Sequence, residues 1–490
     1  MNLFVRKPLS ALLEEAHEEG QDTLKRHLGP GNLILLGIGA IIGAGLFVRT
    51  AAAAADHAGA GVTISFIIAA VGCAFAGLCY AEFASMIPIS GSAYTYSYAT
   101  MGQFIAWIIG WDLVLEYALG AATVSIAWAE YLNKLLAQFI GPDWVIPYAW
   151  CHSPFQVSEM GERGIMNAPA LIILAILTLI LIRGIRESAI VNGIIVAVKV
   201  VIVLLFIALG WSFINPANHD PFIPPVSEYT NSLGITHSFG GWGGILSGAG
   251  VVFFAFIGFD AVSTAAQETV NPKRTMPIGI LGSLAVCTVL YILFSYVLTG
   301  IAPYTDFRSA GLEASVTYAI EQYMTGYGWL ARFITVAILF GFSSVILVML
   351  LGQSRVFYSM SRDGLVPGFF SVLHPRYRTP YKSNVLFLFF VGLFAAFVPG
   401  DVVGDMTSIG TLFAFVLVSL GVILMRRSDP DATRPFRTPL VPLVPILGAL
   451  FCGAMIFGLG VENWSRLLAW LAIGLAIYFV YSRKHAKIKG

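Results

Sequence analysis

The sequence predicts an all-α integral membrane protein with about twelve transmembrane helices, and three observations lead to that prediction. Of the 490 residues, 57% are hydrophobic and only 11% are charged, whereas soluble domains carry about 25% charged residues. Apolar runs long enough to cross a bilayer recur along the whole chain. The basic residues are divided unevenly between the two sides that these runs would define.

The apolar runs give the expected order of the helices. A helix needs about 20 apolar residues to span the hydrocarbon core. The runs lie at 32–55, 61–87, 101–138, 167–183, 189–212, 243–266, 277–302, 327–354, 383–399, 404–425, 440–461 and 465–482. Because the third run is longer than a bilayer requires, we expect it to tilt strongly or to continue along the interface.

The basic residues predict which ends of the runs face the cytoplasm. If both chain ends are cytoplasmic, 21 Lys and Arg residues fall on that side and six near the outer side, together 27 of the 28. Cytoplasmic connections carry such an excess. We therefore expect a multi-pass protein of the cell (inner or plasma) membrane with both termini cytoplasmic. The net charge of +1 argues against a nucleic-acid partner.

Four glycines interrupt the first run between Gly37 and Gly45. Each costs about 1 kcal/mol relative to Ala in a helix, and backbone groups freed at membrane depth persist only where they line a cavity or meet a ligand. One interpretation is a break near residues 42–44. The other is a Gly39-x-x-x-Gly43 face for close packing between helices. A dinucleotide loop does not fit, because the glycine spacing is one residue too long and no strand precedes it.

The sixth run carries a second candidate break at Gly258, with Asp260 two residues later. The first and sixth runs hold corresponding positions in two sets of five. Paired interruptions at such positions are the best sequence indication of a transporter site at the bilayer midplane, which favours a break in the first run too. Because five is odd, the two halves would have opposite orientations, with the last two runs outside the repeat.

Five segments together resemble the amino acid–polyamine–organocation (APC) permease superfamily, and specifically its bacterial cationic amino acid transporter branch. They are residues 37–47, 80–96, 254–261, 268–277 and 352–365. The resemblance covers nearly the whole chain. It implies a LeuT-like 5+5 inverted repeat with interrupted helices 1 and 6, plus two additional helices. It also implies secondary active transport of amino acids, commonly with protons. The branch does not define the substrate, because its bacterial members include carriers of small neutral amino acids.

On this interpretation the chain has four parts. Residues 1–30 form a cytoplasmic N-terminal amphipathic segment, and residues 31–430 form the transport core. Residues 431–482 are helices 11 and 12, and residues 483–490 are a basic cytoplasmic tail. The five cysteines are scattered without the spacing of a metal site, so we expect neither a metal nor a cofactor.

The two breaks predict a binding site for a zwitterion that is built from backbone groups. Bare N–H groups and the helix dipole attract a carboxylate where the first helix resumes, and the resemblance implies the same positions. The N–H groups expected there are those of Gly43, Ala44 and Gly45. The carbonyls expected to bind the ammonium are those of Ile41, Phe254, Ala255 and Ile257.

Three residues around the second break have expected supporting roles. Gly258 permits the break, and Asp260 is expected to cap the backbone freed there. Either Phe254 or Phe259 could close over the site as an aromatic gate. The alternative for both rings is simple packing.

Lys199 lies about ten residues, or about 15 Å, from the nearer end of the fifth run. That distance exceeds the reach of a snorkelling lysine, and its apolar neighbours favour the neutral amine. One interpretation is therefore a proton-coupling group. The resemblance implies that its ammonium replaces a sodium ion between helices 1 and 8, where it would bond carbonyls near Gly39 to Gly43, and Ser343 and Ser344. The alternative is a permanent ion pair with Glu116 or Asp260.

Glu116 could hold a cationic substrate side chain, tune Lys199 or brace the helices. The apolar pocket expected around Ala44 and Ile257 favours proton-coupled symport of small neutral L-amino acids, with cationic amino acids as the second candidate. Exchange, sodium coupling and a non-transporting sensor are the further alternatives. An enzyme is not expected, because the chain has no HExxH or GxSxG motif. The expected partners are the amino acid, protons and the lipid bilayer, and a small single-span membrane protein is left open.

Overall fold

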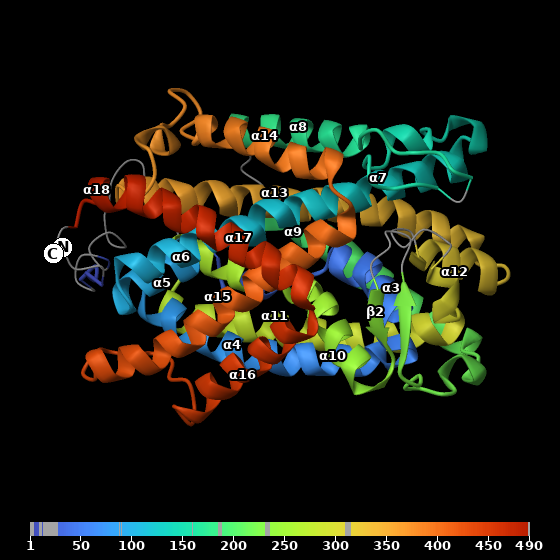
Figure 1. Ribbon diagram of the computed structural model, residues 1–490, viewed down its shortest axis with the longest axis horizontal. Helices are drawn as coiled ribbons and strands as arrows, with labels where there is room; N and C mark the ends of the chain where they lie inside the picture. The colour runs from blue at the N-terminus through green and yellow to red at the C-terminus, as the bar shows by residue number, and fades with distance from the viewer. Residues whose placement is uncertain are drawn as a thin grey trace.

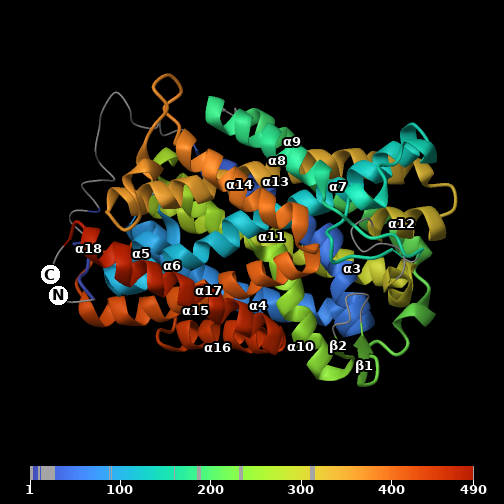
Figure 2. The same cartoon turned by 45° about the horizontal axis from the view of Figure 1, so that its top comes forward.

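The computed structural model describes residues 4–8, 12, 28–87, 89, 91–158, 160–184, 189–230, 236–308 and 315–488. They form an elongated bundle whose helices run mainly along its long axis (Figure 1). Both chain ends lie at one end of the bundle, which we call the termini end (Figure 2). The opposite end carries an antiparallel hairpin of β1 (Ser227–Thr230) and β2 (Thr236–Phe239), and we call it the hairpin end.

The remaining regular structure is helical. The helices are α2 (Pro30–Ile41), α3 (Thr50–Ala53), α4 (Val62–Met86), α5 (Ser92–Thr100), α6 (Gln103–Val114), α7 (Gly120–Phe139), α8 (Ala168–Arg183), α9 (Ala189–Gly210), α10 (Gly241–Val252), α11 (Pro272–Ile301), α12 (Ser315–Tyr323), α13 (Gly328–Arg362), α14 (Tyr381–Phe397), α15 (Gly400–Ser428), α16 (Leu443–Gly458), α17 (Val461–Ile477) and α18 (Arg483–His485).

Eight helical stretches in the described part of the chain are long and apolar enough to cross a membrane, and four shorter apolar helices accompany them. The shorter ones are α2, α8, α14 and α16. Each of the twelve predicted runs falls on this helical framework. An all-α membrane protein is therefore confirmed, since helices satisfy their own backbone hydrogen bonds in lipid. The twelve-span topology stays a prediction.

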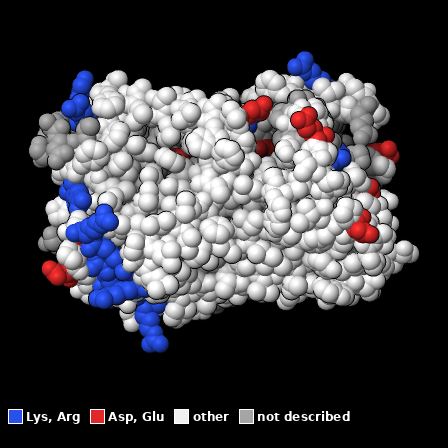
Figure 3. Space-filling view, turned by 60° about the horizontal axis from the view of Figure 1, so that its bottom comes forward, with Lys and Arg blue, Asp and Glu red and all other residues white. Residues whose placement is uncertain are grey.

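The distribution of charged side chains on the surface agrees with a membrane protein. Lys and Arg side chains gather at the termini end, and charged side chains are nearly absent from the lower middle of the face shown in Figure 3. The predicted N-terminal amphipathic segment lies mostly outside the described residues. Of residues 1–30, the structure describes only 4–8, 12 and 28–30.

Both predicted helix interruptions are present. Helix α2 ends at Ile41, and Ile42 is extended with ψ of 104° before a π-helical turn begins at Gly45. In the sixth segment, Ile257 is extended and Gly258 has φ of +116°, a conformation that side chains disfavour. The chain then continues as a 3₁₀ helix, Asp260–Glu268. Helix α11 packs along α2 and α4, which holds the first interruption inside the bundle.

Candidate functional site

The two interruptions touch each other through glycine. A Cβ placed on Gly45 would lie 2.2 Å from the Cα of Ala255, and one on Gly258 would lie 2.9 Å from the carbonyl carbon of Ala40. Neither position has room for a side chain. Close packing between the two segments is therefore present at Gly45 and Gly258, whereas the packing face expected from Gly39 and Gly43 stays a prediction.

Tyr291 of α11 joins the two interrupted segments, and sequence reasoning missed it. Its hydroxyl lies 2.9 Å from the carbonyl oxygen of Ile41 and 2.9 Å from that of Ala255. These two carbonyls were expected to be bare, but each already faces a donor. Because a carbonyl oxygen accepts two hydrogen bonds, each keeps one acceptor position for another group.

Two buried residues at the first break, Gly43 and Ala44, have backbone N–H groups with no backbone acceptor in the described chain. The carbonyl of Gly43 accepts hydrogen bonds from the N–H groups of Leu46 (3.2 Å) and Phe47 (3.4 Å). The segment that resumes there, 45–58, is helical throughout, so its positive dipole end faces this point.

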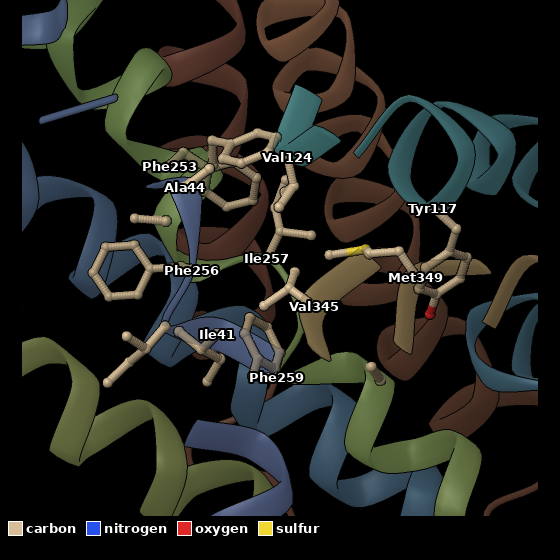
Figure 4. Close-up of a cluster of buried hydrophobic side chains, with 14 of the residues drawn as sticks. Ile41, Ala44, Tyr117, Val124, Phe253, Phe256, Ile257, Phe259, Val345 and Met349 are labelled. Carbon is tan, nitrogen blue, oxygen red and sulfur yellow. The ribbon is translucent and has the colours of Figure 1, made fainter. Parts of the chain in front are cut away.

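The side chains around the breaks are apolar. Ile41 and Ala44 from the first segment gather with Ile257 from the sixth and Val345 from α13 (Figure 4). In the second segment the carbonyl of Phe254 accepts from the N–H of Ile257 at 3.3 Å. All of these side chains are buried. The cluster therefore suits an aliphatic group better than a charged one.

The two candidate gate rings differ in their surroundings. Phe259 is wholly buried and packs against the rings of Tyr80 and Phe415, with centroids 5.8 and 5.0 Å away. These contacts support packing as the role of Phe259 in this structure. Phe254 is 5% exposed and remains the better candidate for a gate.

Lys199 reaches the first interrupted helix from α9. Its side chain is 2% exposed, and its Nζ donates to the carbonyl of Gly39 at 2.8 Å. The stem crosses α13 at Gly341, where an added Cβ would lie 2.9 Å from the lysine Cε. The predicted contact with a carbonyl near the break is therefore present, and Lys199 lies between helices α2 and α13.

The predicted bonds from Lys199 to Ser343 and Ser344 are not made in this structure. The hydroxyl of Ser343 donates instead to the carbonyl of Leu339, one turn earlier in its own helix, at 2.9 Å. Ser344, although buried, forms no hydrogen bond with the lysine. A serine in a helix has its own carbonyl ladder within reach, and this local bond competes with distant partners.

Glu116 and Asp260 form a buried acidic pair. Glu116 lies on a π-helical turn, Leu115–Leu119, between α6 and α7, and its carboxyl group is close enough to that of Asp260 to interact directly. Asp260 accepts a hydrogen bond from the hydroxyl of Tyr117 at 2.9 Å and also faces the N–H groups that begin its own 3₁₀ helix. The contact with these N–H groups is the one that the expected cap by Asp260 would make.

Neither acid of this pair bonds to Lys199. Both carboxyl groups are wholly buried, and within the described chain no Lys or Arg forms an ion pair with them. The permanent ion pair proposed as the alternative role for Lys199 is thus absent from this structure. The roles expected for Glu116 stay predictions.

Comparison with known proteins gives a consistent result. Residues 28–479 match the sequence model described as amino acid permease. A branched-chain amino acid permease of Bacillus subtilis is 45% identical over 99% of each chain, and a methylthioribose transporter of the same organism is 41% identical with the same coverage. The chloroplastic cationic amino acid transporter 9 of Arabidopsis thaliana is 39% identical over 93% of this chain and 77% of its own. These relatives are named as permeases or transporters, in agreement with the expectation that the protein is not an enzyme.

Proposed function

This chain belongs to the amino acid permease family, and from that premise we propose that it is a proton-coupled symporter of neutral amino acids. The observation that carries the proposal is the pair of interrupted segments whose breaks meet inside the bundle. Such breaks in corresponding helices bracket the substrate of transporters built on inverted repeats. The proposal includes twelve spans in the LeuT-like 5+5 arrangement, with the basic termini end in the cytoplasm.

The substrate is bound at both ends by backbone groups. Its carboxylate meets the N–H groups at Gly43 and Ala44, where the resumed helix offers its positive end. Its ammonium meets the carbonyls of Ile41 and Ala255, which each keep one acceptor position beside Tyr291. A molecule that lacks either charged group loses half of these contacts.

The substrate side chain is neutral and aliphatic. The apolar residues around the breaks support this choice, because a charged tail placed among them would lose its hydration. The branched-chain permease among the relatives points in the same direction. Cationic amino acids are the second candidate, favoured by Glu116, a buried acid for which no basic partner is found among the described residues.

Lys199 couples transport to protons. Its ammonium, bound to the carbonyl of Gly39, ties α9 to the interrupted helix beside the carboxylate site. Release of the proton to the cytoplasm weakens that hydrogen bond, because the neutral amine is a poorer donor, and thereby loosens the site. By reciprocity, bound substrate and bound proton stabilise each other by the same free energy. Substrate affinity should therefore fall as rising pH removes the proton.

The test is uptake into proteoliposomes by the purified protein, with and without an inward proton gradient. We expect Ala, Val, Leu or Ile to accumulate with the gradient and without sodium, and their amides and N-acyl derivatives to fail as competitors. Better uptake of Arg or Lys, abolished by Glu116→Gln, would move the substrate to the cationic class. Uptake of methylthioribose, which has neither an α-amine nor a carboxylate, would contradict the zwitterion site.

A further inference from the structure

A separate cavity of about 280 Å³ opens at the hairpin end. It is lined by the outer part of the first interrupted helix, by α10 and β2, by the start of α15 and by the turn from α16 into α17. No residue of α7 or α13 belongs to it. Helix α13 supplies Val345 and Gly341, the neighbour of Lys199, to the central site. This cavity is therefore distinct from that site.

Acidic groups outnumber basic ones around the cavity, and three of the four acids are already paired. Arg49 bridges Asp401, at 3.2 Å, and Asp405 through its two terminal nitrogens. At the start of α17, Arg466 forms an ion pair with Glu462, four residues earlier, at 3.5 Å. Asn463 adds a hydrogen bond to Asp405 at 3.2 Å. The fourth acid, Asp56, takes part in none of these contacts.

Asp56 lines the cavity, is only 8% exposed and forms no hydrogen bond or ion pair within the described part of the chain. The basic groups that act on it from a distance are engaged elsewhere. Arg49 is held by the two aspartates, and the Nε of Arg308 donates to the carbonyl of Ala55 at 2.9 Å while its guanidinium lies 4.8 Å from the ring centroid of Phe239. The neighbouring His57 shares its Nδ1 with Ser247 at 3.0 Å. A buried carboxylate without a partner is costly.

We propose that this cavity is a peripheral binding site for a small organic cation that carries N–H donors, a guanidinium or a primary ammonium, with Asp56 as its anchor. Several N–H groups on one cation can bond the carboxylate of Asp56 together with that of Glu462. Four acids and two arginines line the cavity, and the positive charge of the ligand offsets this formal excess of acids.

A metal ion fits the cavity less well than an organic cation. Among the described residues no group of three His, Cys, Asp or Glu side chains is arranged to hold a metal. The guanidinium of Arg49 also lies against two of the acids and would repel a compact divalent charge. A planar or branched cation spreads its charge over several N–H groups and avoids that repulsion.

An occupant would connect the first interrupted helix with α15 and α17. Asp56 belongs to the former, whereas Asp401 and Glu462 begin the latter two. If the protein transports as proposed above, a cation bound here resists separation of these elements. It should therefore lower the maximal rate of uptake without changing the KM for the substrate. This consequence rests on the proposed function, whereas binding itself does not.

Calorimetric titration of the full-length purified protein with guanidinium at millimolar concentration and constant ionic strength tests the site. The compared variants are Asp56→Asn, Asp56→Ser and Glu162→Gln, the last an exposed acid outside the cavity. We expect saturable binding to the wild type and to Glu162→Gln, with affinity at least tenfold weaker in both Asp56 variants. Tetramethylammonium, which has no N–H group, should bind at least tenfold more weakly than guanidinium.

Each contrary result has a defined meaning. Absence of saturable binding to the wild type, or equal affinity in folded Asp56 variants, would overturn the site. Equal binding of sodium would overturn the organic-cation class. Inhibition of uptake by external guanidinium, lost in Asp56→Asn, is the second measurement. If no amino acid is transported, the titration still decides the binding proposal, so the two proposals fail separately.

Discussion

Lys199 and Arg49 are the two most deeply buried cations in the described chain, and they differ in the partners that hold their positive charge. Lys199 is 2% exposed, among Val and Ile, and its Nζ is bound to the backbone carbonyl of Gly39. Arg49 is 3% exposed and is held by the carboxylates of Asp401 and Asp405. A carbonyl bonds a neutral amine less tightly than an ammonium, whereas two carboxylates form ion pairs with a guanidinium. We therefore expect Lys199 to serve transport and Arg49 to serve stability.

The largest expected effect is on transport in Lys199→Met. The variant should lose gradient-driven accumulation at least tenfold and should bind the substrate more weakly, with an affinity that no longer falls as pH rises. It should keep its unfolding temperature, because methionine fills the same apolar space without a proton. Uptake into proteoliposomes and thermal unfolding in detergent measure accumulation and unfolding temperature. Full accumulation by this variant would contradict the role of Lys199 and leave Glu116, beside Asp260, as the next proton carrier to test.

The next largest effect is expected at Gly43 and Gly45, beside the first break. A Cβ on Gly43 would first meet the side chain of Val345, at 3.1 Å, whereas one on Gly45 would meet the backbone of Ala255 at 2.2 Å. Gly43→Val should weaken substrate binding at least tenfold in a folded protein, because it crowds the carboxylate site. Gly45→Ala should lower the unfolding temperature as well. Normal affinity in a folded Gly43→Val protein would show that Gly43 serves helix packing alone.

Arg49→Met tests the region around Arg49 at the hairpin end. Removal of the guanidinium leaves two aspartates without their partner, which should cost about 1–2 kcal/mol because both acids keep some contact with solvent. The double variant Arg49→Met/Asp405→Asn should recover part of that loss. Substrate affinity should change less than threefold in either protein. A larger loss of affinity at unchanged stability would mean that the hairpin end takes part in substrate binding.

The smallest expected effect is that of Tyr291→Phe, which deletes the hydroxyl between the two interrupted segments. One lost hydrogen bond to a buried carbonyl is worth about 1 kcal/mol. We expect a small drop in unfolding temperature together with weaker substrate binding, because the carbonyls of Ile41 and Ala255 lose their common donor. An effect on stability alone would restrict Tyr291 to a structural role.

The sites of the two breaks could be predicted from residue types because their causes are local. Glycines at 37–45 and at 258 weaken the helix wherever the chain folds, and Gly258 adopts the positive φ that only glycine takes readily. The burial of Lys199 was equally predictable, since it lies far from either end of its apolar run. The roles assigned to these residues in binding and coupling stay predictions.

The partners of these residues could not be predicted in the same way. Ser343 was expected to meet Lys199, yet its hydroxyl satisfies a carbonyl in its own helix. Tyr291, which no motif marks, reaches a carbonyl 250 positions away. Asp56 and Arg49 look unremarkable in the sequence, and only the arrival of α15 and α17 encloses them in one cavity.

By itself, the sequence determined that this is a helical membrane protein with two interrupted helices and a lysine buried between apolar residues. Those properties follow from hydropathy and backbone propensity, which act over one or two turns of chain. Only the tertiary structure decided that Lys199 meets Gly39, that Tyr291 joins the two breaks and that Asp56 faces a cavity without a partner. These contacts join residues distant in the chain, and their geometry depends on how whole helices pack.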